Sequence, residues 1–230
     1  MSIRAVLFDL DNTLTHRDQS IHRYAICLLE YYQEYLMNSN INQIIEVIRR
    51  IDNGGYPKKE LLTYPSIGES IAYVLLQELE WHNAPSLKEL TQFWAEQFAK
   101  NAVSMADAEE LLKRLKEQKY KLAIVSNGAH LSRVAILNNL GLSHYFDAIV
   151  SSGQVGISKP APEIFLHTSQ LLNVKPSECL FIGDHPINDI QGAKNVGMKT
   201  LYMDGFHVAD IDIKNKITHL NQVLDFISSI

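Results

Sequence analysis

The sequence predicts an α/β protein with a mostly parallel sheet, helices on both faces of that sheet, and an inserted helical bundle. Three observations support this fold class: the chain opens on an apolar strand pattern, residues 20–100 carry only helical patterns, and strand and helix patterns alternate from residue 101 onward. Such alternation is typical of right-handed crossovers between parallel strands. We therefore expect a core domain of residues 1–16 and 102–230, interrupted by a helical domain of residues 17–101.

Residues 3–8 predict the first strand, because this short run has the low polar content of a buried parallel strand. Side chains alternate along a strand, so Asp9 and Asp11 leave its end on the same side, and Asn12 and Thr13 supply turn chemistry beyond it. Two carboxylates this close resist being ionised together, so the pair calls for a nearby cation or a retained proton. For this pair alone, an ordinary turn is as good an explanation as a site that binds a cation or retains a proton.

Residues 20–100 predict four amphipathic helices with short breaks between them. The expected helices begin near Ser20, Ile41, Ser66 and Pro85. Serine is a favoured N-cap residue and proline is common in the first helical turn, and the polar residues 16–19 are interpreted as a linker. The apolar and aromatic stripes of these helices are assigned to packing, so the segment forms a bundle that serves as a lid or a small second domain.

Strands and helices alternate in the remainder of the chain. The predicted strands are Lys121–Ser126, Ala148–Ser151, Cys179–Ile182 and Lys199–Met203. The predicted helices are residues 107–119, 129–140, 163–172, 189–196 and 220–227. Gly141 and Gly197 mark the ends of two of these helices, because glycine accepts the left-handed conformation that closes a helix.

Composition excludes several classes of function. The 230 residues include 20% charged and 46% hydrophobic residues, which is the balance of an ordinary soluble protein. The formal charge of −5 argues against a broad nucleic-acid surface, and no apolar run approaches the length of a membrane span. Cys27 and Cys179 lie in apolar surroundings and favour free thiols, and the N-terminus lacks a signal-peptide layout. We expect a cytoplasmic protein that binds neither nucleic acid nor membrane.

Polar side chains stand at the carboxyl ends of the predicted strands and in one loop, where an open parallel sheet binds its ligands. These residues are Asp9 with Asp11, Ser126 with Asn127, Lys159, and Asp184 with Asp189. Taken alone, the Ser126-Asn127 group is better explained by a turn and Lys159 by a solvated charge, while the two aspartate groups are ambiguous. Their succession at the strand ends indicates one crevice. The carboxylates of Asp9, Asp11 and Asp184 form an oxygen-rich site suited to Mg²⁺, which leaves room for water and phosphate.

The remaining members of this set suit a phosphate group. The Lys159 ammonium, the Ser126 hydroxyl and the main-chain amides of the Asn127-Gly128 turn, which leads into a helix, would bind phosphate oxygens. Without such charge cancellation a carboxylate could hardly approach a phosphate dianion, because each charge pair at about 4 Å repels by roughly 4 kcal/mol at an effective dielectric constant near 20. The sequence therefore predicts phosphate chemistry assisted by a metal ion.

The ordered set resembles the four motifs of the haloacid dehalogenase (HAD) superfamily. The matching residues are Asp9-x-Asp11-x-Thr13, the strand-terminal Ser126, Lys159-Pro160, and Gly183-Asp184 with Asp189. The helical insert between the first and second motifs resembles the C1-type helical cap of that superfamily. The resemblance implies a Rossmann-like α/β core with an all-α cap that closes over the substrate, and a supporting role for Thr13.

The resemblance also implies catalytic roles. Asp9 would be the nucleophile and form an aspartyl-phosphate intermediate, which divides one difficult displacement into two easier ones. Asp11 would protonate the leaving-group oxygen and later take a proton from the attacking water. Ser126, Asn127 and Lys159 would hold the transferring phosphoryl group.

The same resemblance implies a Mg²⁺ site. Its ligands would be the Asp9 carboxylate, the main-chain carbonyl of Asp11 and the Asp184 carboxylate. Asp189 would orient Lys159 or a metal-bound water. The presence of Asp11 favours phosphoryl transfer, because family members that cleave carbon–halogen bonds lack this acid and the metal.

The expected function is a Mg²⁺-dependent phosphatase, a phosphoric monoester hydrolase, acting on a small phosphorylated metabolite as a monomer or homodimer. The sequence of residues 11–14 and 154–160 is similar to that of nucleotidase-like members of the superfamily. The substrate class is therefore a nucleoside monophosphate or a sugar phosphate. Two alternatives stay open, namely a sugar phosphomutase that uses the same aspartate pair and a phosphate-binding or phospho-acceptor protein without turnover.

Overall fold

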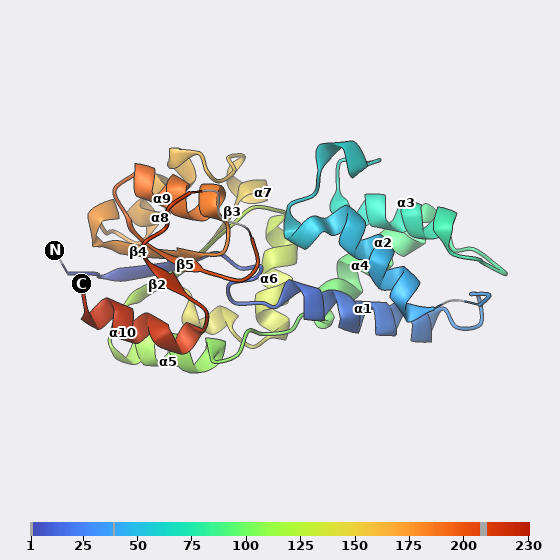
Figure 1. The fold of residues 1–230 in the computed structure, drawn as a ribbon, viewed down its shortest axis with the longest axis horizontal. Helices are drawn as coiled ribbons and strands as arrows, with labels where there is room; N and C mark the ends of the chain where they lie inside the picture. The colour runs from blue at the N-terminus through green and yellow to red at the C-terminus, as the bar shows by residue number, and fades with distance from the viewer. Residues whose placement is uncertain (1, 39, 208–210) are drawn as a thin grey trace. The chain divides into compact units, whose positions relative to one another are not determined.

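The computed structural model describes residues 2–38, 40–207 and 211–230. The chain divides into two compact units, one of Met1–Thr15 with Ser104–Ile230 and one of His16–Val103. The first unit contains the sheet, and the named elements of the described residues in the second unit are helices and 3₁₀ turns (Figure 1). The interpretation of the helical unit as a C1-type cap stays a prediction. Among the described residues, no helix combines the length and the apolar character that crossing a membrane requires.

The sheet unit contains six parallel strands in the spatial order β3-β2-β1-β4-β5-β6. The strands are β1 (Ala5–Phe8), β2 (Lys121–Ser126), β3 (Ala148–Ser151), β4 (Cys179–Gly183), β5 (Lys199–Met203) and β6 (Lys216–Ile217). All residues of β1 are fully buried, as its apolar sequence predicts for a central strand. The prediction of a parallel α/β sheet is confirmed.

Helices cover both faces of this sheet, as predicted. Figure 1 shows α8 and α9 on one face and α5 and α10 on the other. The helices of the sheet unit are α5 (Ala108–Glu117), α6 (His130–Asn139), α7 (Ser152–Val155), α8 (Pro162–Leu171), α9 (Gly192–Asn195) and α10 (Val223–Ser228). Short 3₁₀ turns form at η3 (Ser143–Tyr145), η4 (Pro176–Glu178) and η6 (Leu220–Gln222). Beneath α8, the rings of Phe165 and Phe181 meet edge to face with centroids 5.2 Å apart.

The predicted helix over residues 189–196 is wrong in its start and its type. The chain forms a π-helical turn, η5 (Pro186–Gln191), and only then the short helix α9. The cause is local: Pro186 opens the turn, and the Nδ1 atom of His185 accepts hydrogen bonds from the main-chain N–H groups of Ile187 and Asn188. The earlier start brings Asp189 back toward the sheet.

The helical unit contains the four predicted helices. They are α1 (Arg17–Tyr31), α2 (Ile41–Asp52), α3 (Ile67–Glu78) and α4 (Leu87–Lys100), with 3₁₀ turns at η1 (Asn53–Gly55) and η2 (Lys59–Leu61). Ser66 caps α3, and Ser86 forms a capping box with Glu89 at the start of α4. The fully buried Tyr24 packs against Trp94 with centroids 4.7 Å apart, so this aromatic stripe does form core.

The predicted start of the first helix at Ser20 is wrong, and residues 16–19 are not a linker. His16 is the N-cap, and its side chain accepts a hydrogen bond from the main-chain N–H of Gln19. Ser20 lies inside α1, where its hydroxyl donates to the carbonyl of His16 and accepts from the N–H of Val103. The polar first turn is helical because its Arg17 has a buried partner elsewhere in the bundle.

That partner is Asp52, and the two side chains form a buried ion pair. Arg17 Nε lies 2.8 Å from Asp52 Oδ2, and Arg17 Nη2 lies 2.5 Å from Asp52 Oδ1. The two side chains are 5% and 0% exposed. Asp52 Oδ2 also accepts a hydrogen bond from the N–H of Gly55, so one carboxylate links α1, α2 and the turn that ends α2.

We predict that Asp52→Ala lowers the free energy of unfolding by about 3 kcal/mol, because it leaves a buried guanidinium without its counter-charge. The matched control is Asp18→Ala, which breaks the half-exposed pair with Arg49 and should cost less than about 1 kcal/mol. Urea unfolding followed by circular dichroism measures both values. Equal losses in the two variants would contradict a structural role for the buried pair.

Candidate active site

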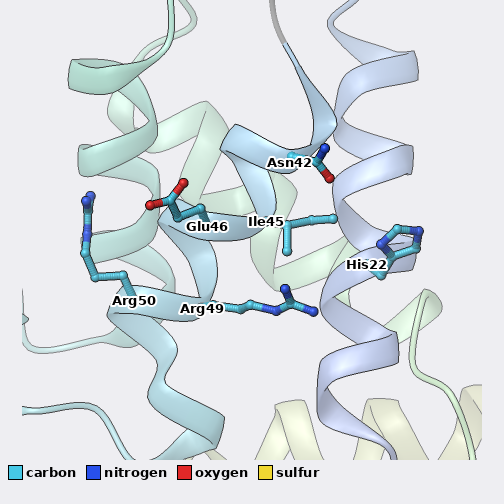
Figure 2. A pocket seen from close by; sticks show the side chains of 6 residues that line it. All are labelled: His22, Asn42, Ile45, Glu46, Arg49 and Arg50. Atoms are coloured by element: carbon cyan, nitrogen blue, oxygen red, sulfur yellow. The ribbon is translucent and has the colours of Figure 1, made fainter.

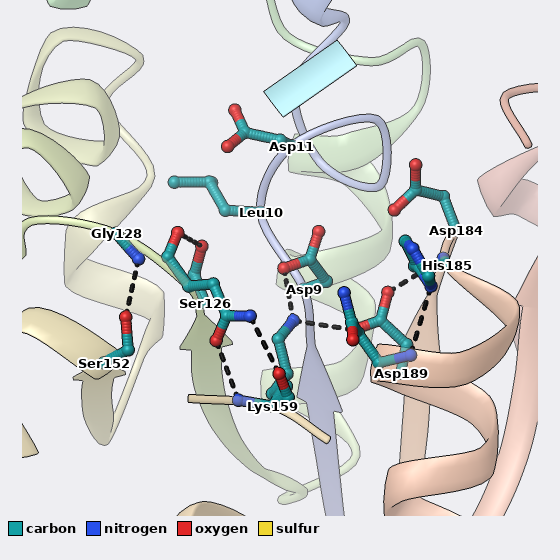
Figure 3. Close-up of polar contacts among 12 residues, drawn as sticks. Asp9, Leu10, Asp11, Ser126, Gly128, Ser152, Lys159, Asp184, His185 and Asp189 are labelled. Carbon is teal, nitrogen blue, oxygen red and sulfur yellow. Dashed lines mark hydrogen bonds and ion pairs between the residues drawn. The ribbon is translucent and has the colours of Figure 1, made fainter. Parts of the chain in front are cut away.

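The carboxyl ends of β1, β2 and β4 place the predicted residues at one edge of the sheet. Phe8 is in register with Ile124 of β2 and with Ile182 of β4, so the polar residues that follow these strands emerge side by side. The N–H of Asp9 donates to the carbonyl of Ile182 at 2.9 Å, which continues the ladder by one residue. Figure 3 shows the side chains that gather at this edge.

Lys159 stands at the centre of the cluster. Its Nζ lies 2.6 Å from Asp9 Oδ1 and 2.6 Å from Asp189 Oδ1, and its side chain is completely buried. Burial lowers the pKa of Lys159, but the two carboxylates outweigh burial and raise that pKa overall. Lys159 is therefore a fixed cation.

At Asp9, the effect of burial on the pKa outweighs that of the neighbouring opposite charge. Burial raises the pKa of Asp9 well above its ordinary value, Lys159 lowers it, and three neighbouring carboxylates raise it further. The Oδ2 atom of Asp9 is buried and accepts no hydrogen bond from the described residues. One ammonium group does not balance so many carboxylates, so the edge of the sheet has an excess of negative charge.

Asn127 fixes the loop that carries Lys159. Its side-chain amide donates to the carbonyl of Lys159 at 3.0 Å, and its Oδ1 accepts from the N–H of Lys159 at 2.8 Å. The N–H of Gly128 donates to the Ser152 hydroxyl at 2.8 Å. The Asn127 side chain is therefore occupied, and the phosphate contact expected from its main-chain N–H stays a prediction.

Two predicted hydroxyl residues lie at the same edge. Ser126 is the last residue of β2, and its buried hydroxyl is 3.4 Å from the carbonyl of Asn127, which is a weak contact that a phosphate oxygen can replace. The hydroxyl of Thr13 is fully buried in the turn after Asp9 and Asp11 and has no hydrogen-bond partner among the described residues.

Gly183 allows Asp189 to fold back against the sheet. A Cβ atom at Gly183 would lie 2.4 Å from Asp189 Oδ2, a distance that real Cβ contacts do not reach. Asp189 Oδ2 accepts the N–H of His185 at 2.9 Å, while its Oδ1 contacts Lys159. Both oxygens of Asp189 are thus engaged, and the orienting role expected for it stays a prediction.

Asp184 faces His207, which the sequence did not indicate. Asp184 Oδ2 lies 3.1 Å from His207 Nε2. Burial raises the pKa of Asp184 to about 6, and the contact with His207 opposes that shift. His207 lies in the loop after β5, where no motif or spacing marks it. His185 shapes η5 through its ring nitrogen.

Asp11 pairs with a second residue that the sequence did not indicate. Asp11 Oδ2 lies 3.3 Å from Nη2 of Arg133, a largely buried residue of α6. Figure 3 shows the Asp11 carboxylate turned away from Lys159. The signal that could have found Arg133 is its place one turn into the helix that follows the Ser-Asn-Gly motif.

The donor set at this edge fits a divalent cation. Asp9, Asp184 and Asp189 each offer a carboxylate oxygen, and these oxygens all lie within 4.8 Å of one another. Mg²⁺ and similar hard cations prefer such oxygen ligands. Since both oxygens of Asp189 are engaged, Asp9 and Asp184 are the carboxylates best able to bind a metal. The Asp11 side chain is outside this group, so the predicted ligand role of its main-chain carbonyl stays a prediction.

A hollow in the helical unit lacks this chemistry. Figure 2 shows its lining side chains, which enclose about 810 Å³. They are His22, Asn42, Ile45, Glu46, Arg49 and Arg50. Arg49 is already paired with Asp18 and Arg50 with Glu78. These guanidinium groups are surface ion pairs, so the strand ends are the stronger candidate site.

The chain is similar in sequence to a known hydrolase family and to two phosphatases. A family model for haloacid dehalogenase-like hydrolases matches residues 3–197. The glyceraldehyde 3-phosphate phosphatase of Pyrococcus furiosus is 28% identical over 234 residues, covering 97% of this chain and 92% of that protein. The N-acylneuraminate-9-phosphatase of Mus musculus is 29% identical over 202 residues, covering 86% of this chain and 80% of that protein.

The fold is shared with a solved structure as well. The putative HAD-hydrolase YfnB from Bacillus subtilis, solved bound to magnesium, superposes with a TM-score of 0.74. The two chains are 24% identical, and the match covers 99% of each. At this level of identity the likeness shows a common fold.

The charge excess leads to a prediction for Asp184→Asn in metal-free protein. A carboxyl group whose pKa is higher in the folded state loses stability as it ionises, so the wild type weakens relative to the variant as the pH rises from 3.8 to about 6. We expect the variant to be more stable by up to about 3 kcal/mol at pH 8 in EDTA. Thermal and urea unfolding measure the difference.

Magnesium should reverse the order of stability, so that the wild type becomes more stable than Asp184→Asn. Added Mg²⁺ stabilises the folded wild type through binding at ionised Asp184, and it leaves Asp184→Asn unchanged. Asp225→Asn, an exposed substitution in α10, is the control and should behave as the wild type. Equal stabilisation of wild type and Asp184→Asn by Mg²⁺ would exclude Asp184 as a ligand.

Proposed function

Because this chain belongs to the haloacid dehalogenase-like hydrolase family, we propose that it is a Mg²⁺-dependent phosphatase that hydrolyses a small phosphorylated metabolite through Asp9. The observation that carries this proposal is the position of Lys159 Nζ, 2.6 Å from both Asp9 Oδ1 and Asp189 Oδ1, beside the buried Asp184. A fixed cation next to a carboxylate nucleophile and an acidic metal site is the arrangement that phosphoryl transfer requires.

The carboxylate of Asp9 is the attacking group in this proposal. One of its oxygens forms a bond to phosphorus while the bond from phosphorus to the leaving alcohol breaks, which yields an aspartyl-phosphate and a free alcohol. Lys159 holds the nucleophile in place, and Ser126 and the N–H of Asn127 bind phosphoryl oxygens. A metal ion held by Asp9, Asp184 and the Asp11 carbonyl would offset negative charge on the carboxylates and the phosphoryl group.

Asp11 supplies the proton transfers. In the first step it donates a proton to the oxygen of the departing alcohol, and in the second it accepts a proton from the water that attacks the phosphorus. Inorganic phosphate leaves and Asp9 is regenerated. The acid at this position favours a phosphatase over a dehalogenase, because family members that cleave carbon–halogen bonds lack it.

The relatives favour one of the two expected substrate classes. Glyceraldehyde 3-phosphate and N-acylneuraminate 9-phosphate, the substrates in the names of the two relatives, are phosphate esters of sugars. We therefore infer that a sugar phosphate is the better candidate than a nucleoside monophosphate. The helical unit, which the resemblance interprets as a cap, would select the leaving group by closing over the site.

We predict that the wild type releases phosphate from at least one member of a panel of sugar phosphates and nucleoside monophosphates when Mg²⁺ is present. Asp9→Asn should lower this rate by at least about a thousandfold, because the nucleophile is removed. A colorimetric phosphate assay measures release, and Asp225→Asn is the matched control that keeps the wild-type rate. Wild-type rates in Asp9→Asn would refute the role of Asp9, and interconversion of sugar phosphates without release would select the phosphomutase alternative.

A further inference from the structure

The side chain of Arg133 connects the general acid to the phosphate-binding loop. Arg133 lies in the first turns of α6, and its side chain is 10% exposed. Its Nη2 donates to the carbonyl of Asn127 at 2.7 Å and lies 3.3 Å from Asp11 Oδ2. One guanidinium group therefore contacts both the loop after β2 and the loop after β1.

The loop after β2 is shaped around this guanidinium. Gly128 has a φ of +131°, and a Cβ atom at this position would lie 2.4 Å from Arg133 Nη2 and 3.0 Å from its Nε. A side chain at position 128 would thus be strained by the backbone and would also displace the guanidinium. Asn127 in turn is held by two hydrogen bonds to the main chain of Lys159. Arg133 is therefore anchored to the rigid part of the site.

The two contacts of Nη2 differ in kind. The 2.7 Å bond to the Asn127 carbonyl is a full hydrogen bond, whereas 3.3 Å to Asp11 is an ion-pair distance. Arg133 is thus fixed by the loop after β2, and its guanidinium reaches from there to the Asp11 carboxylate. Arg133 Nε is buried and has no hydrogen-bond partner among the described residues, so the guanidinium can donate a hydrogen bond to a further oxygen without losing its anchor.

We propose that Arg133 is a positioning residue that holds the Asp11 carboxylate beside the phosphate-binding loop, where it can reach the leaving-group oxygen. This inference rests on the proposed function, in which Asp11 protonates that oxygen. Misplacing a catalytic group by about 1 Å can lower a rate by about a hundredfold. The loss should depend on the leaving group, because an alcohol needs a proton in order to leave and an acidic phenol does not.

The test compares two substrates. In Arg133→Gln, kcat on a sugar phosphate, or on glycerol phosphate as a simple alkyl ester, should fall by at least about tenfold, since general acid catalysis contributes at least about a hundredfold. On p-nitrophenyl phosphate the loss should stay below about threefold. Arg133→Lys, which keeps the charge, should recover part of the alkyl-ester rate and also serves if the glutamine variant folds poorly. Arg114→Gln, an exposed substitution in α5, is the control.

A double-mutant cycle separates positioning from a structural role. Asp11→Asn should show the same selective loss on alkyl esters, and adding Arg133→Gln to it should cause no further selective loss. Equal losses on both substrates in Arg133→Gln, or a further selective loss in the double variant, would overturn the inference alone. A wild-type enzyme that releases phosphate from none of these esters would overturn the proposed function and this inference with it.

Discussion

The ammonium group of Lys159, buried between Asp9 and Asp189, is the interaction on which the site depends. A buried lysine is stable only if its charge is balanced, and here two carboxylates provide that balance. A different element fixes each carboxylate. Asp9 is fixed by the main-chain hydrogen bond that extends the β1–β4 ladder, and Asp189 is fixed by η5, which can approach the sheet because Gly183 has no side chain. The main chain of Lys159 is clamped by Asn127. The cation is therefore held at both ends of its side chain.

The site carries more negative charge than its two nearby cationic side chains can offset. The pKa values of Asp9 and Asp184 are raised chiefly by burial and further by neighbouring carboxylates. Buried carboxylates with raised pKa values are typical of functional sites, because a fold selected for stability alone would not bury several carboxylates together. The local instability makes the site receptive to a metal ion and to the chemistry of a phosphate group.

Most of the sheet could be predicted from the sequence because its strands are short apolar runs with clear ends, and β2, β3 and β5 have the predicted bounds. The motif residues could be placed because parallel strands bring their carboxyl ends together. Other features depend on tertiary contacts. His16 became a cap because Arg17 is buried against Asp52, and β6 is too short for any periodicity. Arg133 and His207 approach the site only through the folded chain.

The order of the elements along the chain bears on how the protein is made. β1 is synthesised before its sheet neighbours β2 and β4, which begin only at Lys121 and Cys179. This fully buried strand therefore stays unpaired while the whole helical unit is synthesised. An exposed apolar strand edge of this kind invites association with other chains, and it is what chaperones recognise. Because of the helical insertion, the nascent chain is prone to aggregation until the neighbouring strands of β1 have been synthesised.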